Sequence, residues 1–141
     1  MPVIETAGKK EPNKDFKNEI PRSLRILLIE DNHDLAEMLR TMLQLKGHTV
    51  DTAYNGVEGI EKIKKFLPDV VFCDIGMSEM DGIETAKRIR NEPSLKDLFL
   101  VALTGYAAQR DIELAIESGF NRHLAKPVDG VTLEKILVDV P

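Results

Sequence analysis

The segment RILLIEDNHDLAEMLRTMLQLKG, residues 25–47, joins two hydrophobic patterns with different periods. After its first residue it begins with a short continuous apolar run, which is typical of a strand buried on both faces of a sheet. Between Leu35 and Leu43 the apolar residues recur at helical spacing, and Lys46 with Gly47 closes the pattern as a helix end does. The segment therefore predicts one buried strand followed by one helix.

This strand and helix pattern repeats four more times along the chain. The further strands are expected at residues 48–53, 69–73, 98–103 and 123–125. The further helices are expected from the apolar spacing within residues 57–67, 83–89, 108–116 and 133–137. Apolar and polar residues alternate in the second strand, which indicates a place near a sheet edge. Five such units in strict alternation predict an α/β fold, with a parallel sheet and helices on both faces.

The composition bounds the class of protein without naming its chemistry. The chain has 141 residues, with 43% hydrophobic and 30% charged residues, as expected for one globular domain. Its formal net charge of -5 argues against a surface dedicated to nucleic acid. No apolar run approaches the roughly 20 residues of a membrane span, and the N-terminus lacks the apolar core of a secretory signal. A cytoplasmic protein without direct membrane contact is expected.

Two further features concern the organisation of the chain. Residues 1–22 are polar, carry Lys, Glu, Asn and Pro, and show no apolar periodicity, so they are expected to form a flexible tail or linker. The domain is then expected to span residues 23–141. The single cysteine, Cys73, lies in an apolar run and can form no intrachain disulfide, which is compatible with a reducing compartment.

Polar side chains follow four of the predicted strands. Glu30 and Asp31 follow the first strand, Asp74 the third, Thr104 the fourth and Lys126 the fifth. In open α/β sheets the ligands bind outside the carboxyl ends of the strands, so these side chains are expected at one rim. Clustered carboxylates favour a hard cation such as Mg²⁺. With a lysine and a hydroxyl nearby, an aspartate can attack phosphorus and form an aspartyl phosphate.

Each of these residues also has an ordinary structural interpretation. Asp31 alone could cap the first helix, Asp74 could be a turn residue, and Lys126 could be a solvated surface lysine. Their joint occurrence at four strand ends is what favours a shared site.

Four segments carry a resemblance to a known family. They are LLIEDN at 27–32, VVFCDIGMSEMDG at 70–82, VALTG at 101–105 and HLAKPV at 123–128. From about Arg25 to Val138 the chain resembles the receiver domains of bacterial response regulators and hybrid sensor kinases. The segments ALTGYAAQRD, from Ala102, and ESGFNRHLAKPVDGVTLEKIL look more like the receivers of hybrid histidine kinases than those of transcription factors.

The resemblance implies a fold and a function. The fold would be flavodoxin-like and doubly wound, with five parallel strands in the order 2-1-3-4-5. The function would be to take a phosphoryl group from a phosphohistidine on a sensor histidine kinase or histidine phosphotransfer protein. The protein would act as a phosphoacceptor that hydrolyses its own phosphoryl group slowly, rather than as an enzyme, and would be a monomer or weak dimer.

The resemblance also implies roles for individual residues. Asp74 would be the phosphoacceptor, Lys126 would bind the phosphoryl group and Thr104 would be the switch hydroxyl. The Mg²⁺ ligands would be Glu30 through water, Asp31, Asp74 and the backbone carbonyl of Gly76. The Lys126–Pro127 peptide bond would be cis.

Two positions depart from the family pattern. Ser78 stands where proline is common, so the loop after the acceptor loses a rigid turn residue. His123 stands where the family usually has tyrosine or phenylalanine, and it could be either a switch residue or a strand residue pointing to solvent. Phosphorylation would act on the surface formed by the fourth helix, the fifth strand and the fifth helix, with His123 at its centre.

Other functions that use similar folds fit the sequence less well. Phosphatases of the haloacid dehalogenase type need a second Asp two residues after the nucleophile, and here that residue is Gly76. A pseudo-receiver typically lacks an acid or the lysine, and this chain has them all. A flavodoxin-type cofactor would need a Ser, Thr or Gly-rich loop where the chain has the acidic EDNHD, and the chain lacks a Walker-type phosphate loop.

Overall fold

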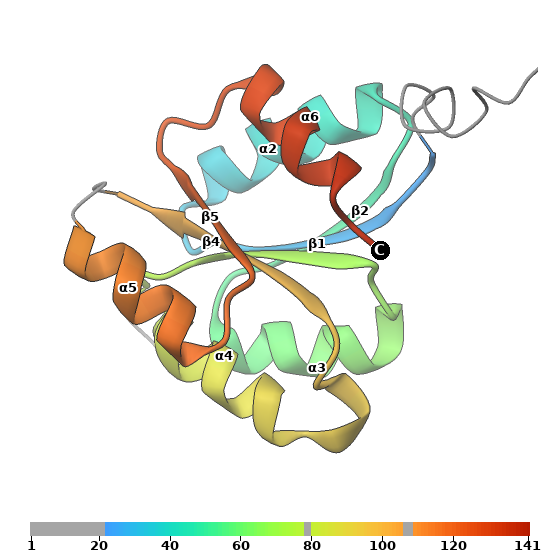
Figure 1. Cartoon of the computed structure of the whole chain (residues 1–141). Helices are drawn as coiled ribbons and strands as arrows, with labels where there is room; N and C mark the ends of the chain where they lie inside the picture. Colours follow the sequence, from blue (N-terminus) through green and yellow to red (C-terminus); the bar gives the residue numbers. More distant parts are fainter. Residues whose placement is uncertain (1–21, 78–79, 106–108) are drawn as a thin grey trace, which may run out of the picture.

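A computed structural model describes residues 22–77, 80–105 and 109–141. The predicted tail therefore lies outside the described residues, apart from Arg22, as does Ser78. Within these ranges the chain alternates strands and helices from Arg25 onward (Figure 1). The strands are β1 (Arg25–Ile29), β2 (Thr49–Ala53), β3 (Val70–Asp74), β4 (Phe99–Thr104) and β5 (Arg122–Ala125). The predicted strands are all present, with boundaries that differ by one residue.

The strands form one parallel sheet in the order β2-β1-β3-β4-β5. This is the flavodoxin-like order that the resemblance implied, and it places β2 at an edge, as its alternating pattern predicted. The register pairs Ile29 with Ala53 and Cys73, and Asp74 with Leu103. The carboxyl ends of the strands therefore meet at one rim of the sheet.

The helices cover both faces of this sheet (Figure 1). They are α2 (His33–Leu45), α3 (Gly56–Phe66), α4 (Gly82–Asn91), α5 (Gln109–Ser118) and α6 (Gly130–Val138), with a 3₁₀ turn at Pro93–Leu95. Helices α2 and α6 lie on one face, and α3, α4 and α5 on the other. Four of them begin after an Asn or Asp whose side chain accepts a hydrogen bond from a backbone N–H of the first turn, which stabilises a helix start.

Each face of the sheet has its own hydrophobic core. Alternate residues of one strand point to opposite faces, so Leu28 and Phe72 pack with Leu39 of α2 and Leu133 of α6. On the other face, Ile29, Cys73 and Leu100 are among the strand residues that pack against α3, α4 and α5. The central strands are buried on both sides, which explains their continuous apolar runs.

In the described ranges, no helix is long and apolar enough to cross a bilayer.

Candidate functional site

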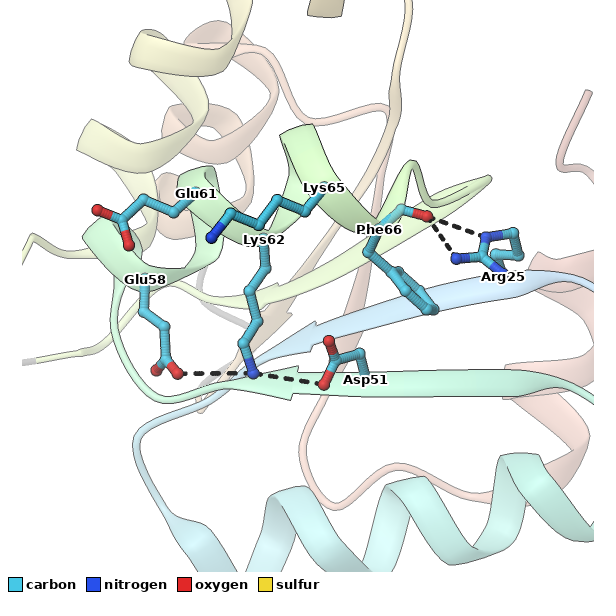
Figure 2. Close-up of a pocket in the computed structure, with 7 residues that line it drawn as sticks. All are labelled: Arg25, Asp51, Glu58, Glu61, Lys62, Lys65 and Phe66. Carbon is cyan, nitrogen blue, oxygen red and sulfur yellow. Dashed lines mark hydrogen bonds and ion pairs between the residues drawn. The ribbon is translucent and has the colours of Figure 1, made fainter.

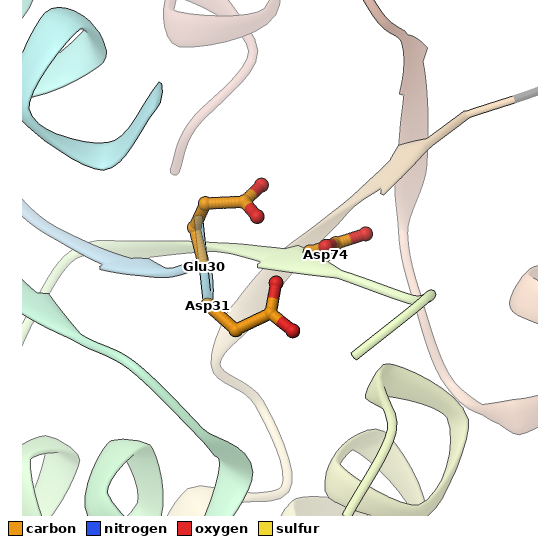
Figure 3. Close-up of side chains that lie close together, drawn as sticks. All are labelled: Glu30, Asp31 and Asp74. Carbon is orange, nitrogen blue, oxygen red and sulfur yellow. The ribbon is translucent and has the colours of Figure 1, made fainter. Parts of the chain in front are cut away.

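Three carboxylates meet where β1 and β3 end. Glu30 and Asp31 directly follow β1, and Asp74 is the last residue of β3 (Figure 3). A carboxylate oxygen of each lies within 4.8 Å of the others. Glu30 and Asp74 are buried, with 0% and 5% of their surfaces exposed, whereas Asp31 faces solvent. The strand register thus brings together the acidic residues that the sequence placed at one rim.

Lys126 lies between the two buried carboxylates. Its Nζ is 3.0 Å from Glu30 Oε1 and 3.2 Å from Asp74 Oδ2. The residue directly follows β5, its backbone N–H donates to the carbonyl of Thr104 at 2.8 Å, and its bond to Pro127 is cis. The solvated-lysine interpretation is therefore wrong, because this ammonium group pairs with two acids from distant parts of the chain.

The pocket has more negative charge than Lys126 balances. Burial is the largest effect on the Glu30 carboxyl and, with the nearby charge of Asp74, raises its pKa to about 7, although hydrogen bonds from Lys126 and the Asn32 N–H oppose this. Burial lowers the pKa of Lys126, but the hydrogen bond to Glu30 and the charges of Asp74 and Glu30 outweigh it, so the pKa is raised overall. The lysine is firmly cationic, and the acids still favour added positive charge.

The donor set of this pocket fits a hard divalent cation. Glu30 Oε1 is buried and, within the described part of the chain, accepts no further hydrogen bond beyond its ion pair with Lys126. Asp31 is free for such a role because Asn32, and not Asp31, caps α2 through a hydrogen bond from the Leu35 N–H at 3.1 Å. Oxygen atoms of several carboxylates are the ligands that Mg²⁺ and similar ions prefer.

Gly76 contacts the acceptor candidate through its backbone. Its N–H donates to Asp74 Oδ1 at 2.9 Å and so fixes one carboxylate oxygen. A β-carbon at Gly76 would lie 3.6 Å from that oxygen, an ordinary contact distance, so the position has room for a side chain.

Thr104 ends β4 at the same rim and is buried, with 1% of its surface exposed. Its hydroxyl donates to the carbonyl of Leu124 in β5 at 3.4 Å. In this structure the hydroxyl is thus engaged with the neighbouring strand.

The comparison with known families agrees with this geometry. A model described as the response regulator receiver domain matches residues 26–138. The chain belongs to that family.

Relatives of this receiver occur in proteins of very different length. It is 38% identical over 112 residues to an uncharacterised 14.6 kDa protein of Leptolyngbya boryana. The matched region covers 79% of this chain and 86% of that protein. The receiver is 34% identical over 131 residues to the osmosensing histidine protein kinase SLN1 of Saccharomyces cerevisiae, which covers 89% of this chain but 10% of the kinase. Other relatives are transcriptional regulatory proteins and hybrid histidine kinases. The chain thus matches a module that longer proteins also contain.

A solved structure bears on the acidic pocket. The receiver domain of the sensor histidine kinase PA1611 from Pseudomonas aeruginosa is 28% identical, with a TM-score of 0.77 over 84% of this chain and 98% of that chain. That structure has a magnesium ion coordinated in its active-site cleft.

His123 of the receiver lies in β5 and is exposed, while its neighbour Leu124 is buried. The solvent-facing alternative is therefore the one that this structure adopts. His123 therefore lies on the surface of an edge strand and not in the core.

A second group of charged side chains lines a groove between β2 and α3 (Figure 2). Here the charges are paired with one another: Lys62 Nζ lies 3.3 Å from Asp51 Oδ1 and 3.6 Å from Glu58 Oε2. Lys62 also donates to the Thr52 carbonyl at 2.6 Å. This groove is separate from the rim that carries Asp74, and its internal pairing makes it part of the scaffold.

Sequence reasoning overlooked Asn32 beside the pocket. Its backbone N–H donates to Glu30 Oε2 at 3.1 Å while its side chain caps α2, so it links the helix start to a buried acid. The signal was present, because Asn immediately before a helical apolar pattern is a capping residue.

Proposed function

We propose that Asp74 of this receiver accepts a phosphoryl group from a phosphohistidine on a partner protein. The observation that supports this most is the position of Lys126, whose Nζ lies within 3.2 Å of Asp74 and 3.0 Å of Glu30. A cation held against the acceptor by two buried acids can stabilise charge on the oxygens of a transferring phosphoryl group.

The transfer needs no further reactant. A carboxylate oxygen of Asp74 forms a bond to phosphorus while the P–N bond of the phosphohistidine breaks, and the imidazole nitrogen keeps the electron pair. Gly76 orients the attacking carboxylate through its N–H at 2.9 Å. Thr104 would then exchange its hydrogen bond to the Leu124 carbonyl for one to a phosphoryl oxygen.

Mg²⁺ is the proposed cofactor. Glu30, Asp31, Asp74 and the carbonyl of Gly76 would hold it, with Glu30 acting through water. When bound, the ion supplies positive charge to the phosphoryl oxygens. The cluster of three carboxylates and the raised pKa of Glu30, which indicates excess negative charge in the pocket, support this assignment. The magnesium ion in the related Pseudomonas receiver also supports it.

The partner, location and domain bounds of the receiver are also proposed. The partner would be a sensor histidine kinase or histidine phosphotransfer protein, and the receiver would belong with those of hybrid kinases in the cytoplasm. Residues 23–141 would form the domain and 1–22 a tail or linker. The receiver would be a monomer or weak dimer, and it would hydrolyse its own phosphoryl group slowly.

The output surface would be formed by α5, β5 and α6. Thr104 precedes α5 and Lys126 directly follows β5, so the two residues that would respond to the phosphoryl group are joined to this surface. A partner that binds this surface more tightly in the phosphorylated state would favour that state in return.

The metal requirement can be tested with acetyl phosphate as the donor. We expect wild type to gain one phosphoryl group by intact mass in Mg²⁺, and to lose this labelling in excess EDTA. Asp31→Asn should also lose it, because the exposed carboxylate of the metal site is removed. Asp34→Asn is the matched control, since Asp34 is an exposed acid in the first turn of α2. Full labelling of Asp31→Asn, or of wild type in EDTA, would refute the metal assignment.

A further inference from the structure

Three helices of the receiver begin with the same pair of residue types. Asn55-Gly56, Asp81-Gly82 and Asp129-Gly130 each place a capping side chain before a glycine that is the first helical residue. Neither Gly82 nor Gly130 has a positive φ, so the backbone conformation does not require glycine there. The reason for glycine at these helix starts must be sought in the space around it.

The space around Gly82 is filled by the backbone of the proposed acceptor. A β-carbon at this position would lie 2.6 Å from the carbonyl oxygen of Asp74 and 2.6 Å from the Cα of Ile75. It would also lie 3.0 Å from the carbonyl carbon of Asp74. These are all main-chain atoms, which cannot rotate away as a side chain can. The start of α4 therefore rests directly on the peptide that follows Asp74.

Gly130 shows that the sequence pattern alone does not create this contact. A β-carbon there would meet only the Met42 methyl, at 3.9 Å, which is ordinary van der Waals distance. The two glycines follow equivalent Asp caps, whose carboxylates accept N–H bonds at 2.9 Å from Glu84 and at 2.8 Å from Thr132. They differ in what the helix start touches.

The peptide under Gly82 is tied to the rest of the site. The Ile75 N–H donates to the carbonyl of Leu103 at 3.1 Å, which holds the end of β3 against β4. The Gly76 N–H donates to Asp74 Oδ1, and Asp74 Oδ2 faces Lys126. Moving this peptide would shift the carboxylate relative to both of these groups.

We propose that Gly82 is a positioning residue for Asp74, and that the lack of a side chain at the start of α4 sets the place of the acceptor carboxylate. The inference rests on the proposed function of Asp74. Gly82→Ala must push α4 outward or displace the Asp74–Ile75 peptide. Displacements of about 1 Å at a reacting group can cost up to about 100-fold in rate.

The test compares Gly82→Ala with two glycine controls. Gly130→Ala makes the same substitution after the same type of cap without a close contact. Gly119→Ala places a β-carbon 2.6 Å from Arg90 Cγ at a residue with a φ of +121°, close to the amino end of β5. It should therefore destabilise the fold at the end of the sheet opposite the rim.

The readouts are the acetyl phosphate labelling rate per folded molecule, Mg²⁺ affinity and the backbone amide NMR shifts. We expect Gly82→Ala to label at least about tenfold more slowly, to bind Mg²⁺ more weakly and to shift the amide of Gly76. Gly130→Ala should match wild type in all three. Gly119→Ala should melt at a lower temperature and still label at the wild-type rate.

Several outcomes would overturn the proposal. One is a folded Gly82→Ala that labels at the wild-type rate. Another is a Gly82→Ala variant that stays unfolded at low temperature with a stabilising osmolyte, under conditions in which Gly119→Ala folds. Gly82 would then be required for folding and not for the position of the acceptor. A wild type that fails to label would instead refute the proposed function, so the two failures are distinguishable.

Discussion

At the scale of single residues, buried polar groups mark both the site and the scaffold of this receiver. Glu30 lies in the pocket with a carboxyl whose pKa is raised to about 7, first by burial. This is the signature of a group whose position serves function at some cost in stability. His48 is a second buried polar residue, far from the pocket, and its role is structural.

The environment of His48 predicts a pH dependence of stability. The Leu24 N–H donates to Nδ1 at 3.0 Å, which requires a ring without a proton on that nitrogen. Burial, followed by the charge of Lys46, lowers the pKa of His48, while Glu134 opposes this weakly. The pKa of His48 is therefore lower in the folded state than in the unfolded state. The contribution of the neutral ring to the unfolding free energy is complete above about pH 6.5 and is lost as the pH falls through the folded-state pKa.

We therefore compare the unfolding free energies of wild type and His48→Gln, measured by urea denaturation at pH 7.5 and at pH 5.5. From pH 7.5 to pH 5.5 the unfolding free energy of wild type should fall more than that of His48→Gln. The difference should change by no more than about 1.4 kcal/mol per pH unit, the limit for one proton. His123→Gln is the control for the loss of a histidine, because this histidine is exposed. Parallel pH profiles for wild type and His48→Gln would contradict this account of His48.

At the scale of elements, side chains occupy the peptide groups of Thr52 at the open edge of β2. In the parallel ladder the Thr49 N–H and the Ala53 carbonyl face β1, so the peptide groups of Thr52 face outward. The Thr52 N–H donates to Asp51 Oδ1 at 2.8 Å, and its carbonyl accepts from Lys62 Nζ at 2.6 Å. Unpaired edge groups are templates for association, and here those of Thr52 are occupied.

Removal of the Lys62 ammonium should reopen that edge. Lys62→Met keeps most of the apolar stem but leaves the Thr52 carbonyl without its donor, which should lower the unfolding free energy by about 1 kcal/mol. Sedimentation velocity should also show more self-association than in wild type. Lys65→Met is the control, since Lys65 lines the same groove and is exposed. Equal stability and association of the two variants would show that the edge needs no such protection.

The elements also show where sequence reasoning succeeds and where it stops. The apolar runs of 26–29 and 70–73 predicted buried strands because each strand must bury both of its faces. Strand ends were placed to within one residue, as for β4, predicted at 98–103 and observed at Phe99–Thr104. Boundaries depend on single hydrogen bonds at element ends, which hydrophobic periodicity does not report.

Contacts between distant segments account for most of what the sequence left open. The rim residues could be predicted because parallel strands must end together, so Glu30, Asp74 and Lys126 were expected near one another. The packing of Gly82 on the Asp74 peptide and the bonding of Lys62 to Thr52 depend on how α4 and α3 dock, and no local pattern encodes those distances. The orientation of His123 likewise follows from the sheet and not from its neighbours in sequence.

At the scale of the whole molecule, the doubly wound sheet gathers the ends of β1, β3, β4 and β5 into one rim. The rim joins a pocket that is buried and acidic to the exposed surface of α5, β5 and α6 (Figure 1). The same receiver module occurs in relatives that range from a short protein to long kinases. The residues of the proposed chemistry, with Asp74 at its centre, all lie within this module.

The most direct test of that chemistry is to locate the phosphoryl group. Wild type would be labelled with acetyl phosphate in Mg²⁺, reduced with borohydride to trap the acyl phosphate, digested and mapped by mass spectrometry, beside Asp74→Asn treated in the same way. We expect one modified residue, Asp74, and no labelling of Asp74→Asn. Labelling of another residue, or equal labelling of both proteins, would contradict the assignment of Asp74 as the phosphoacceptor.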